Sequence, residues 1–331
     1  MKKLLGFAIA VFLLGGCNSD NSLFKDAQLA ASKGKTADAI QIYTRLIKQN
    51  PNAAAAYLNR GVLWENAPAK NAKEKKKNLA YAEQDYLKAI EVDNKFAQAY
   101  NNLGALYIEQ KNYDEALYNL DSALYYSPAY FTALMNRAIV RSRMGHTDKA
   151  LKDFNDALSL RDNEPMLYFN RAVVYFNIQQ YGAAVEDFSH AIMYDPENPR
   201  LFLERSRALD KAGYPASAYA DLEEAITIKP DYALAYYYMS DLLYRKGELE
   251  MALGYLARAK ELANEYAPTY ELMGDMLAMN DPVVAVANYK AALKLDPAHK
   301  QRYERKLNLM RSEQGRERIT SERFKPKDIK K

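Results

Sequence analysis

The residues of this chain that could do chemistry are few and scattered. Its three histidines, His146, His190 and His299, lie far apart and lack the spacing of metal ligands. The sequence contains no Gly-x-Ser-x-Gly, no His-Glu-x-x-His and no glycine-rich phosphate loop. We therefore expect no catalytic residues, no metal site and no cofactor other than a covalent lipid, for which the one cysteine is the candidate.

That cysteine, Cys17, follows an export-signal pattern. Lys2 and Lys3 precede an apolar run from Leu4 to Leu14, which is too short to span a bilayer as a stable helix. The stretch Leu-Gly-Gly-Cys that ends at Cys17 resembles a bacterial lipobox. The resemblance implies that residues 1–16 are a lipoprotein signal peptide and that Cys17 carries fatty acids such as palmitate. The alternative is an ordinary secretory signal with a chance cysteine.

The lipobox resemblance also implies a location. Residues 17–22 would be a short tether, with five residues between Cys17 and Leu23, a reach under about 18 Å. The first folded part would then lie near a bacterial membrane and face the periplasm. Asn18 is not the aspartate that retains such proteins in the inner membrane of enterobacteria, which favours the outer membrane.

The charge of the chain is uneven although its net value is only +4. The segments 70–77 and 300–331 carry +4 and +7, and the rest of the chain is acidic on balance. We interpret 70–77 as a loop whose lysines either meet anionic lipid head groups or simply face solvent. These lysines are Lys70, Lys73, Lys75, Lys76 and Lys77. With the protein outside the cytoplasm, nucleic acid is not an expected partner.

A repeat of about 34 residues organises the chain from residue 20 to residue 299. Residues 99–128 and 167–196 align with small residues, aromatic residues and the closing proline in register. Glycines 34, 145, 213 and 247 stand where the first helix of a repeat must end. The repeat boundaries follow from this register: 20–53, 54–96, 97–130, 131–164, 165–198, 199–232, 233–266 and 267–299.

The repeat 97–130 resembles the tetratricopeptide repeat in all eight signature places of that family. These are Tyr100, Leu103, Gly104 and Tyr107 on the first helix, Ala116, Leu120 and Ala123 on the second, and Pro128. The resemblance implies an all-α, right-handed α-solenoid of about eight helix-turn-helix units. We expect a C-terminal capping helix over 300–314 and a mobile basic tail over 315–331.

Two positions of the repeat vary together, one on each helix, and both hold a charged residue in the same repeats. Four repeats have an arginine on the first helix, and the same four have an aspartate one place before the aromatic or leucine of the second helix. We predict a partly buried ion pair in each, because a buried charge without its partner costs several kcal/mol. The pairs are Arg60 with Asp85, Arg137 with Asp153, Arg171 with Asp187, and Arg205 with Asp221.

The stripe of the first helices that does not pack inward is the candidate binding site. In the tetratricopeptide family the first helices line a concave groove, and aromatic and arginine side chains there suit an extended or helical peptide. The groove candidates are Arg143, Phe169, Phe176, Asn177, Arg207, Lys211, Tyr237, Asp241, Tyr244 and Arg245. The alternative is that the tyrosines only pack against one another.

Two functions follow from these patterns. The first is a membrane-anchored scaffold or adaptor that binds protein or peptide partners in its groove, within the cell envelope. The second is a self-assembling component of an envelope complex, in which one copy receives the basic tail of another.

Overall fold

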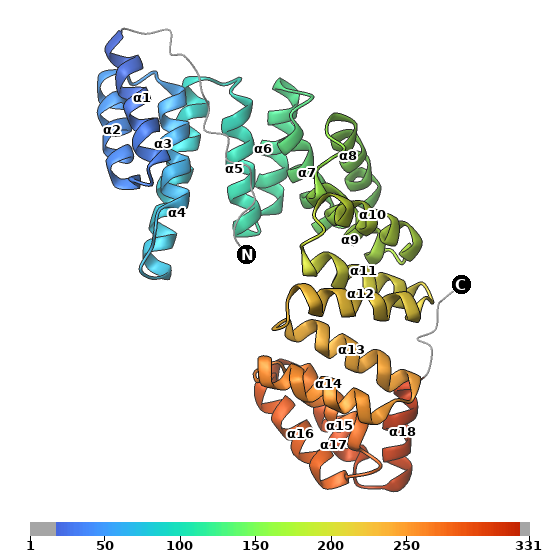
Figure 1. Cartoon of the computed structure of the whole chain (residues 1–331). Helices are drawn as coiled ribbons and strands as arrows, with labels where there is room; N and C mark the ends of the chain where they lie inside the picture. The colour runs from blue at the N-terminus through green and yellow to red at the C-terminus, as the bar shows by residue number, and fades with distance from the viewer. Residues whose placement is uncertain (1–17, 325–331) are drawn as a thin grey trace. The chain divides into compact units, whose positions relative to one another are not determined.

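The computed structural model describes residues 18–324 of the chain. The predicted signal peptide, Cys17 and residues 325–331 lie outside the described residues. Within them the chain forms eighteen α-helices, one short 3₁₀ helix at Pro297–His299 and no strand (Figure 1). The chain divides into two compact units, residues 1–170 and 171–331, and the division falls inside helix α9.

The first unit is a stack of helices in which each helix packs against the next in the chain. A helix pair falls in each of its four predicted repeats. The helices are α1 (Asn18–Ser32), α2 (Thr36–Gln49), α3 (Ala54–Asn66), α4 (Ala72–Val92), α5 (Ala97–Gln110), α6 (Tyr113–Tyr126), α7 (Phe131–Arg143) and α8 (Thr147–Leu160).

The second unit continues in the same way and ends in two further helices that pack on α15 and α16. Its helices are α9 (Pro165–Asn177, shared with the first unit), α10 (Tyr181–Tyr194), α11 (Pro199–Lys211), α12 (Pro215–Ile228), α13 (Ala233–Lys246), α14 (Leu249–Leu262), α15 (Ala267–Leu277), α16 (Pro282–Leu295), α17 (Lys300–Leu309) and α18 (Glu313–Phe324). The predicted all-α solenoid of tetratricopeptide helix pairs is confirmed.

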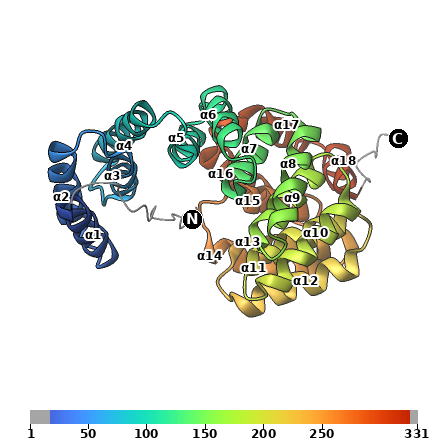
Figure 2. The same ribbon diagram turned by 90° about the horizontal axis from the view of Figure 1, so that it is seen from above.

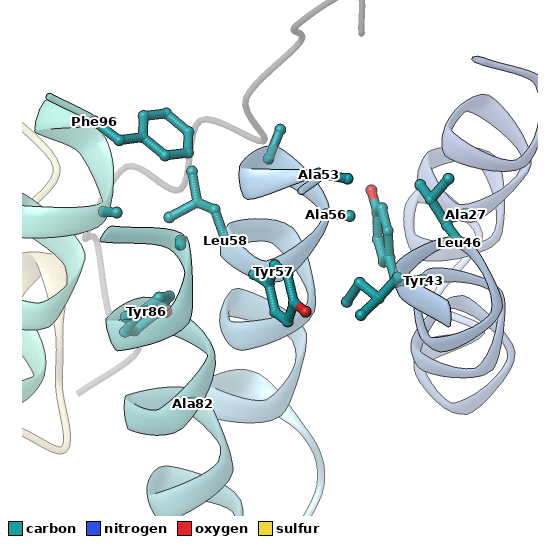
Figure 3. Close-up of a cluster of buried hydrophobic side chains, with 14 of the residues drawn as sticks. Ala27, Tyr43, Leu46, Ala53, Ala56, Tyr57, Leu58, Ala82, Tyr86 and Phe96 are labelled. Carbon is teal, nitrogen blue, oxygen red and sulfur yellow. The ribbon is translucent and has the colours of Figure 1, made fainter. Parts of the chain in front are cut away.

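The core of the first unit shows how neighbouring pairs share their apolar faces. Tyr43 and Leu46 of α2 belong to one cluster with Tyr57 and Leu58 of α3, and Tyr86 of α4 joins it from the other side of α3 (Figure 3). No single pair could bury these rings alone, so each repeat depends on its neighbours.

The turn between the two helices of a repeat has a fixed backbone conformation. Gly145, Gly213 and Gly247 have φ angles of 80, 88 and 90°, in the left-handed region. The equivalent places in two other repeats hold Lys111 and Gln179, both with φ 63°. A side chain costs about 1–2 kcal/mol in this conformation, so these two turns are strained where the others are not.

Three predicted segments differ in the structure. Residues 18–22, expected to be a tether, form the start of α1, where the Asp20 carboxylate accepts a hydrogen bond of 3.1 Å from the Asn50 side chain. Most of the expected lysine loop is helical, because α4 begins at Ala72. The Asn71 side chain caps α4 by accepting from the Glu74 backbone N–H at 2.9 Å.

The expected mobile tail is also partly helical. Residues 313–324 form α18, whose Ile319 is buried in a cluster with Tyr289 and Met310. Gly315 lets α18 start against the end of α17, since an added Cβ would lie 2.0 Å from the Leu309 carbonyl oxygen. The part of the predicted tail after residue 324 lies outside the described residues.

We predict that Lys111→Gly stabilises the protein by about 1 kcal/mol, because glycine adopts the left-handed turn after α5 without a Cβ penalty. Urea denaturation followed by circular dichroism measures the change. Lys111→Ala is the control, since it removes the same charge but keeps a Cβ. Equal stabilisation by both variants would show that the charge, not the backbone, matters.

Candidate functional site

The four arginine–aspartate pairs belong to the framework. In each pair the guanidinium grips the carboxylate with two donors, Nε and Nη2. The Nη2 to Oδ1 distances are 2.7 Å for Arg60 and Asp85, 2.7 Å for Arg137 and Asp153, 2.6 Å for Arg171 and Asp187, and 2.7 Å for Arg205 and Asp221.

These arginines also fasten one repeat to the one before it. Arg60 Nη1 donates to Thr44 Oγ1 at 3.0 Å, and Arg205 Nη1 donates to Ser189 Oγ at 3.1 Å. Arg137 makes the same reach to the Asp121 carboxylate at 2.7 Å. Their donors are therefore engaged inside the stack and do not face a partner.

In the second unit, Arg207 lies against two aromatic rings, and one of these belongs to a cluster of three tyrosines. We call Phe176, Arg207, Tyr237, Tyr238 and Tyr266 the aromatic–arginine surface. The Arg207 guanidinium lies 5.3 Å from the centres of both the Phe176 and Tyr238 rings, and it pairs with Glu204. The residues come from the first helices α9, α11 and α13 and from the residue before α15.

Edge-to-face contacts join the three tyrosines of this surface. The Tyr237 ring centre lies 5.3 Å from that of Tyr238 and 5.5 Å from that of Tyr266, with interplanar angles of 77 and 88°. All three are half-buried, and burial raises the pKa of the Tyr238 and Tyr266 hydroxyls. Tyr238 and Tyr266 therefore stay neutral at physiological pH, and the three rings form an aromatic face beside the Arg207 guanidinium.

Next to this surface, Arg245 is held by two carboxylates. It makes two hydrogen bonds of 2.9 Å to Asp210 and one of 3.1 Å to Asp241. Burial alone would lower the pKa of Arg245, but the hydrogen bonds and charges of Asp210 and Asp241 outweigh it and raise that pKa. Arg245 is therefore neutralised within the protein, and its hydrogen bonds to Asp210 tie α13 to α11.

Two groove predictions are wrong because the side chains are buried. Tyr244 is 4% exposed and its hydroxyl donates to the Asp275 carbonyl at 3.3 Å, which joins α13 to α15. Phe169 is 5% exposed. Arg143, Asn177 and Lys211 are exposed as predicted for a groove-lining stripe, with Asn177 and Lys211 in the second unit and Arg143 in the first.

Two members of this region, Tyr238 and Tyr266, were not among the predicted groove residues. Tyr238 stands at a position where the family usually has asparagine, so it was interpreted as a framework residue and not as a groove residue. Tyr266 directly precedes a first helix, as do Phe96, Tyr130 and Tyr232. The recurrence of an aromatic residue at this position is the sequence signal that could have identified Tyr266.

The described residues 18–324 contain no group of three or more histidine, cysteine, aspartate or glutamate side chains placed to hold a metal ion. Among the helices of the same range, none combines the length and the apolar character that a membrane crossing requires.

Comparison with known proteins identifies the repeats. Family models described as the tetratricopeptide repeat match residues 24–74, 95–163 and 167–198. The chain is a tetratricopeptide repeat protein. This fold suggests protein–protein interaction.

Its relatives match it in part. The human Protein O-mannosyl-transferase TMTC3 is 32% identical over 141 residues, 42% of this chain and 14% of the relative. The Hsp70-Hsp90 organizing protein 3 of Arabidopsis thaliana is 31% identical over 94 residues, 28% of this chain and 15% of the relative. The chain thus spans about one seventh of these curated relatives.

A solved structure supports the fold over most of the chain. A tetratricopeptide repeat protein from Parabacteroides merdae aligns with a TM-score of 0.56 and 20% identity. The alignment covers 84% of this chain and 99% of that one.

We predict that Tyr244→Ala and Tyr237→Ala differ in their effect on stability. Tyr244→Ala should lower the free energy of unfolding by about 3–5 kcal/mol, because it leaves a cavity in a buried site. Tyr237→Ala should lower it by about 1 kcal/mol, because Tyr237 is only half-buried. Urea denaturation of both variants measures the two losses. Equal losses would show that Tyr237 is as much a core residue as Tyr244.

Proposed function

We propose that this protein is a lipid-anchored scaffold of the bacterial cell envelope that binds protein or peptide partners. The observation that carries the proposal is the aromatic–arginine surface, a half-exposed cluster of rings and a guanidinium on the first helices of the second unit. Aromatic residues and arginine supply most of the binding energy at protein interfaces.

The geometry of this surface favours a peptide ligand. Its rings are fixed by contacts with one another, so a partner does not have to order them on binding. Arg207 lies between two rings, where a ligand carbonyl or carboxylate meets a partly desolvated guanidinium. Exposed Lys211 and Asn177 on the neighbouring turns add polar contacts for a backbone.

The anchor belongs to the proposal through the sequence around Cys17. The lipobox-like Leu-Gly-Gly-Cys supports acylation of Cys17, with residues 1–16 removed as a signal peptide. Because α1 begins at Asn18, an acylated Cys17 would hold the first repeat against the bilayer. Asn18 in place of aspartate supports the outer membrane, with the repeats in the periplasm.

We predict that Cys17→Ser abolishes lipid attachment, so that a high-salt wash moves the protein from the membrane fraction to the soluble fraction. Metabolic labelling with palmitate in a bacterial host, followed by fractionation, measures both effects. Cys17 is the one cysteine of the chain, so no other thiol can take the label. A wild-type chain that carries no label contradicts the anchor and leaves the binding surface untouched.

We predict that the double variant Arg207→Ala with Tyr237→Ala lowers peptide binding by at least tenfold, because it removes both kinds of contact at the centre of the surface. A peptide selected by display on the wild-type chain serves as ligand, and calorimetry measures its Kd. The control is Tyr214→Ala, since Tyr214 is 62% exposed and lies outside the surface. Unchanged affinity in the double variant would contradict this site.

A further inference from the structure

The first two turns of α4 form a projection on the first unit. Helix α4 has 21 residues and its partner α3 has 13, so the start of α4 extends past the end of α3. Figure 1 shows this end of α4 reaching beyond α1, α2 and α3. The projection carries the lysine-rich segment, and its net charge is +4 over residues 70–77.

The lysines of the projection have two different roles. Successive helix residues are rotated by about 100°, which places Lys73, Lys76 and Lys77 on one face together with Tyr81. These three lysines are exposed. Lys75 points the other way and its Nζ donates to the Glu65 carbonyl at 2.7 Å, where it satisfies an acceptor at the end of α3.

Two aromatic rings lie beside the lysine face. Trp64 of α3 packs on Tyr81 of α4 with ring centres 4.9 Å apart, and Lys77 Nζ lies 5.5 Å from the Tyr81 ring centre. Trp64 is half-buried and Tyr81 is 37% exposed. We call Trp64, Lys73, Lys76, Lys77 and Tyr81 the basic–aromatic face.

Further lysines lie at the same end of this stack. Helices α1 to α4 pack side by side in chain order and alternate in direction (Figures 1 and 2). The turn between α1 and α2, with exposed Lys33 and Lys35, therefore lies at the same end as the start of α4. The positive end of the α4 dipole adds to this field.

We propose that the basic–aromatic face docks on an anionic lipid bilayer. Lysines near a bilayer each gain about 1 kcal/mol from anionic lipids, and their long side chains reach the head groups from a helix lying on the surface. Tryptophan and tyrosine are the side chains enriched at the level of the head groups. The Trp64–Tyr81 pair is what favours a bilayer over a soluble polyanion.

This inference rests on the proposed function only for the presence of a membrane, and it adds an orientation. Helix α1 starts at the end of the α1–α4 stack opposite to the projection, because neighbouring helices alternate in direction. Its 15 residues span about 22 Å. An acylated Cys17 and the basic–aromatic face contact one bilayer together when the axes of α1 to α4 lie along the membrane plane.

The test uses the mature chain, residues 17–331, with Cys17→Ser, so that neither an acyl chain nor the apolar run from Leu4 to Leu14 contributes. Vesicles of phosphatidylcholine with phosphatidylglycerol, and vesicles of phosphatidylcholine alone, are titrated into the protein. Trp64 is the one tryptophan of the chain, so its emission reports on this face directly. We expect a shift to shorter wavelength with the anionic vesicles that is reversed by 0.5 M salt, roughly three times the physiological ionic strength.

Two triple variants with the same loss of charge distinguish the effect of the lysines on this face from the effect of net charge. Lys73→Gln, Lys76→Gln and Lys77→Gln together should lower the partition coefficient by on the order of 100-fold, about fivefold for each lysine. The control replaces Lys48, Lys95 and Lys152 with glutamine, which removes the same charge from exposed sites outside the face. The control should retain binding.

Three results would overturn the proposal. They are no binding to anionic vesicles, equal losses in the two triple variants, and binding to heparin with the same salt dependence but no Trp64 shift on vesicles. The last would assign the face to a soluble polyanion. None of them bears on acylation of Cys17 or on the aromatic–arginine surface.

Discussion

The close approach of the two helices in each repeat is the constraint on which the rest of the structure depends. A Cβ added to Gly61 would lie 2.7 Å from the Tyr86 ring, and one added to Gly274 would lie 2.6 Å from the Tyr289 ring. Gly104 meets Leu120 in the same way, with an added Cβ 2.8 Å from its side chain, and other repeats have a buried alanine or serine at this place. The spacing leaves little room for water, so buried polar groups between the helices rely on protein partners, although the Tyr43 hydroxyl has none.

The buried polar groups follow from that spacing. Tyr289 donates to Asp275 at 2.8 Å, and burial raises the pKa of its hydroxyl. Asp275 and Glu271, 2% and 3% exposed, are neutralised by Lys306 of α17, while Arg302 also pairs with Glu271 at 2.8 Å. Helix α17 thus provides the basic partners for buried carboxylates at the end of the stack, as the framework arginines do within the stack.

Periodicity explains what the sequence predicts and what it does not. The helix pairs and the arginine–aspartate pairs repeat in register, so a comparison between repeats detects them. The same register places Arg207 and Tyr237 on the predicted groove-lining stripe. Burial of Tyr244 depends on Asp275, 31 residues further on, and the start of α4 depends on Asn71 and on Lys75 meeting α3. These contacts are specific to one repeat, so a comparison between repeats cannot detect them.

The two proposed sites are built from different repeats, and this has a consequence for how they work. In a repeat stack, stability is close to a sum of terms within repeats and between neighbours. The basic–aromatic face uses α3 and α4, whereas the aromatic–arginine surface uses first helices from α9 onward. No residue belongs to both, and no repeat contributes to both. On these two proposals, membrane contact and partner binding can change independently of each other.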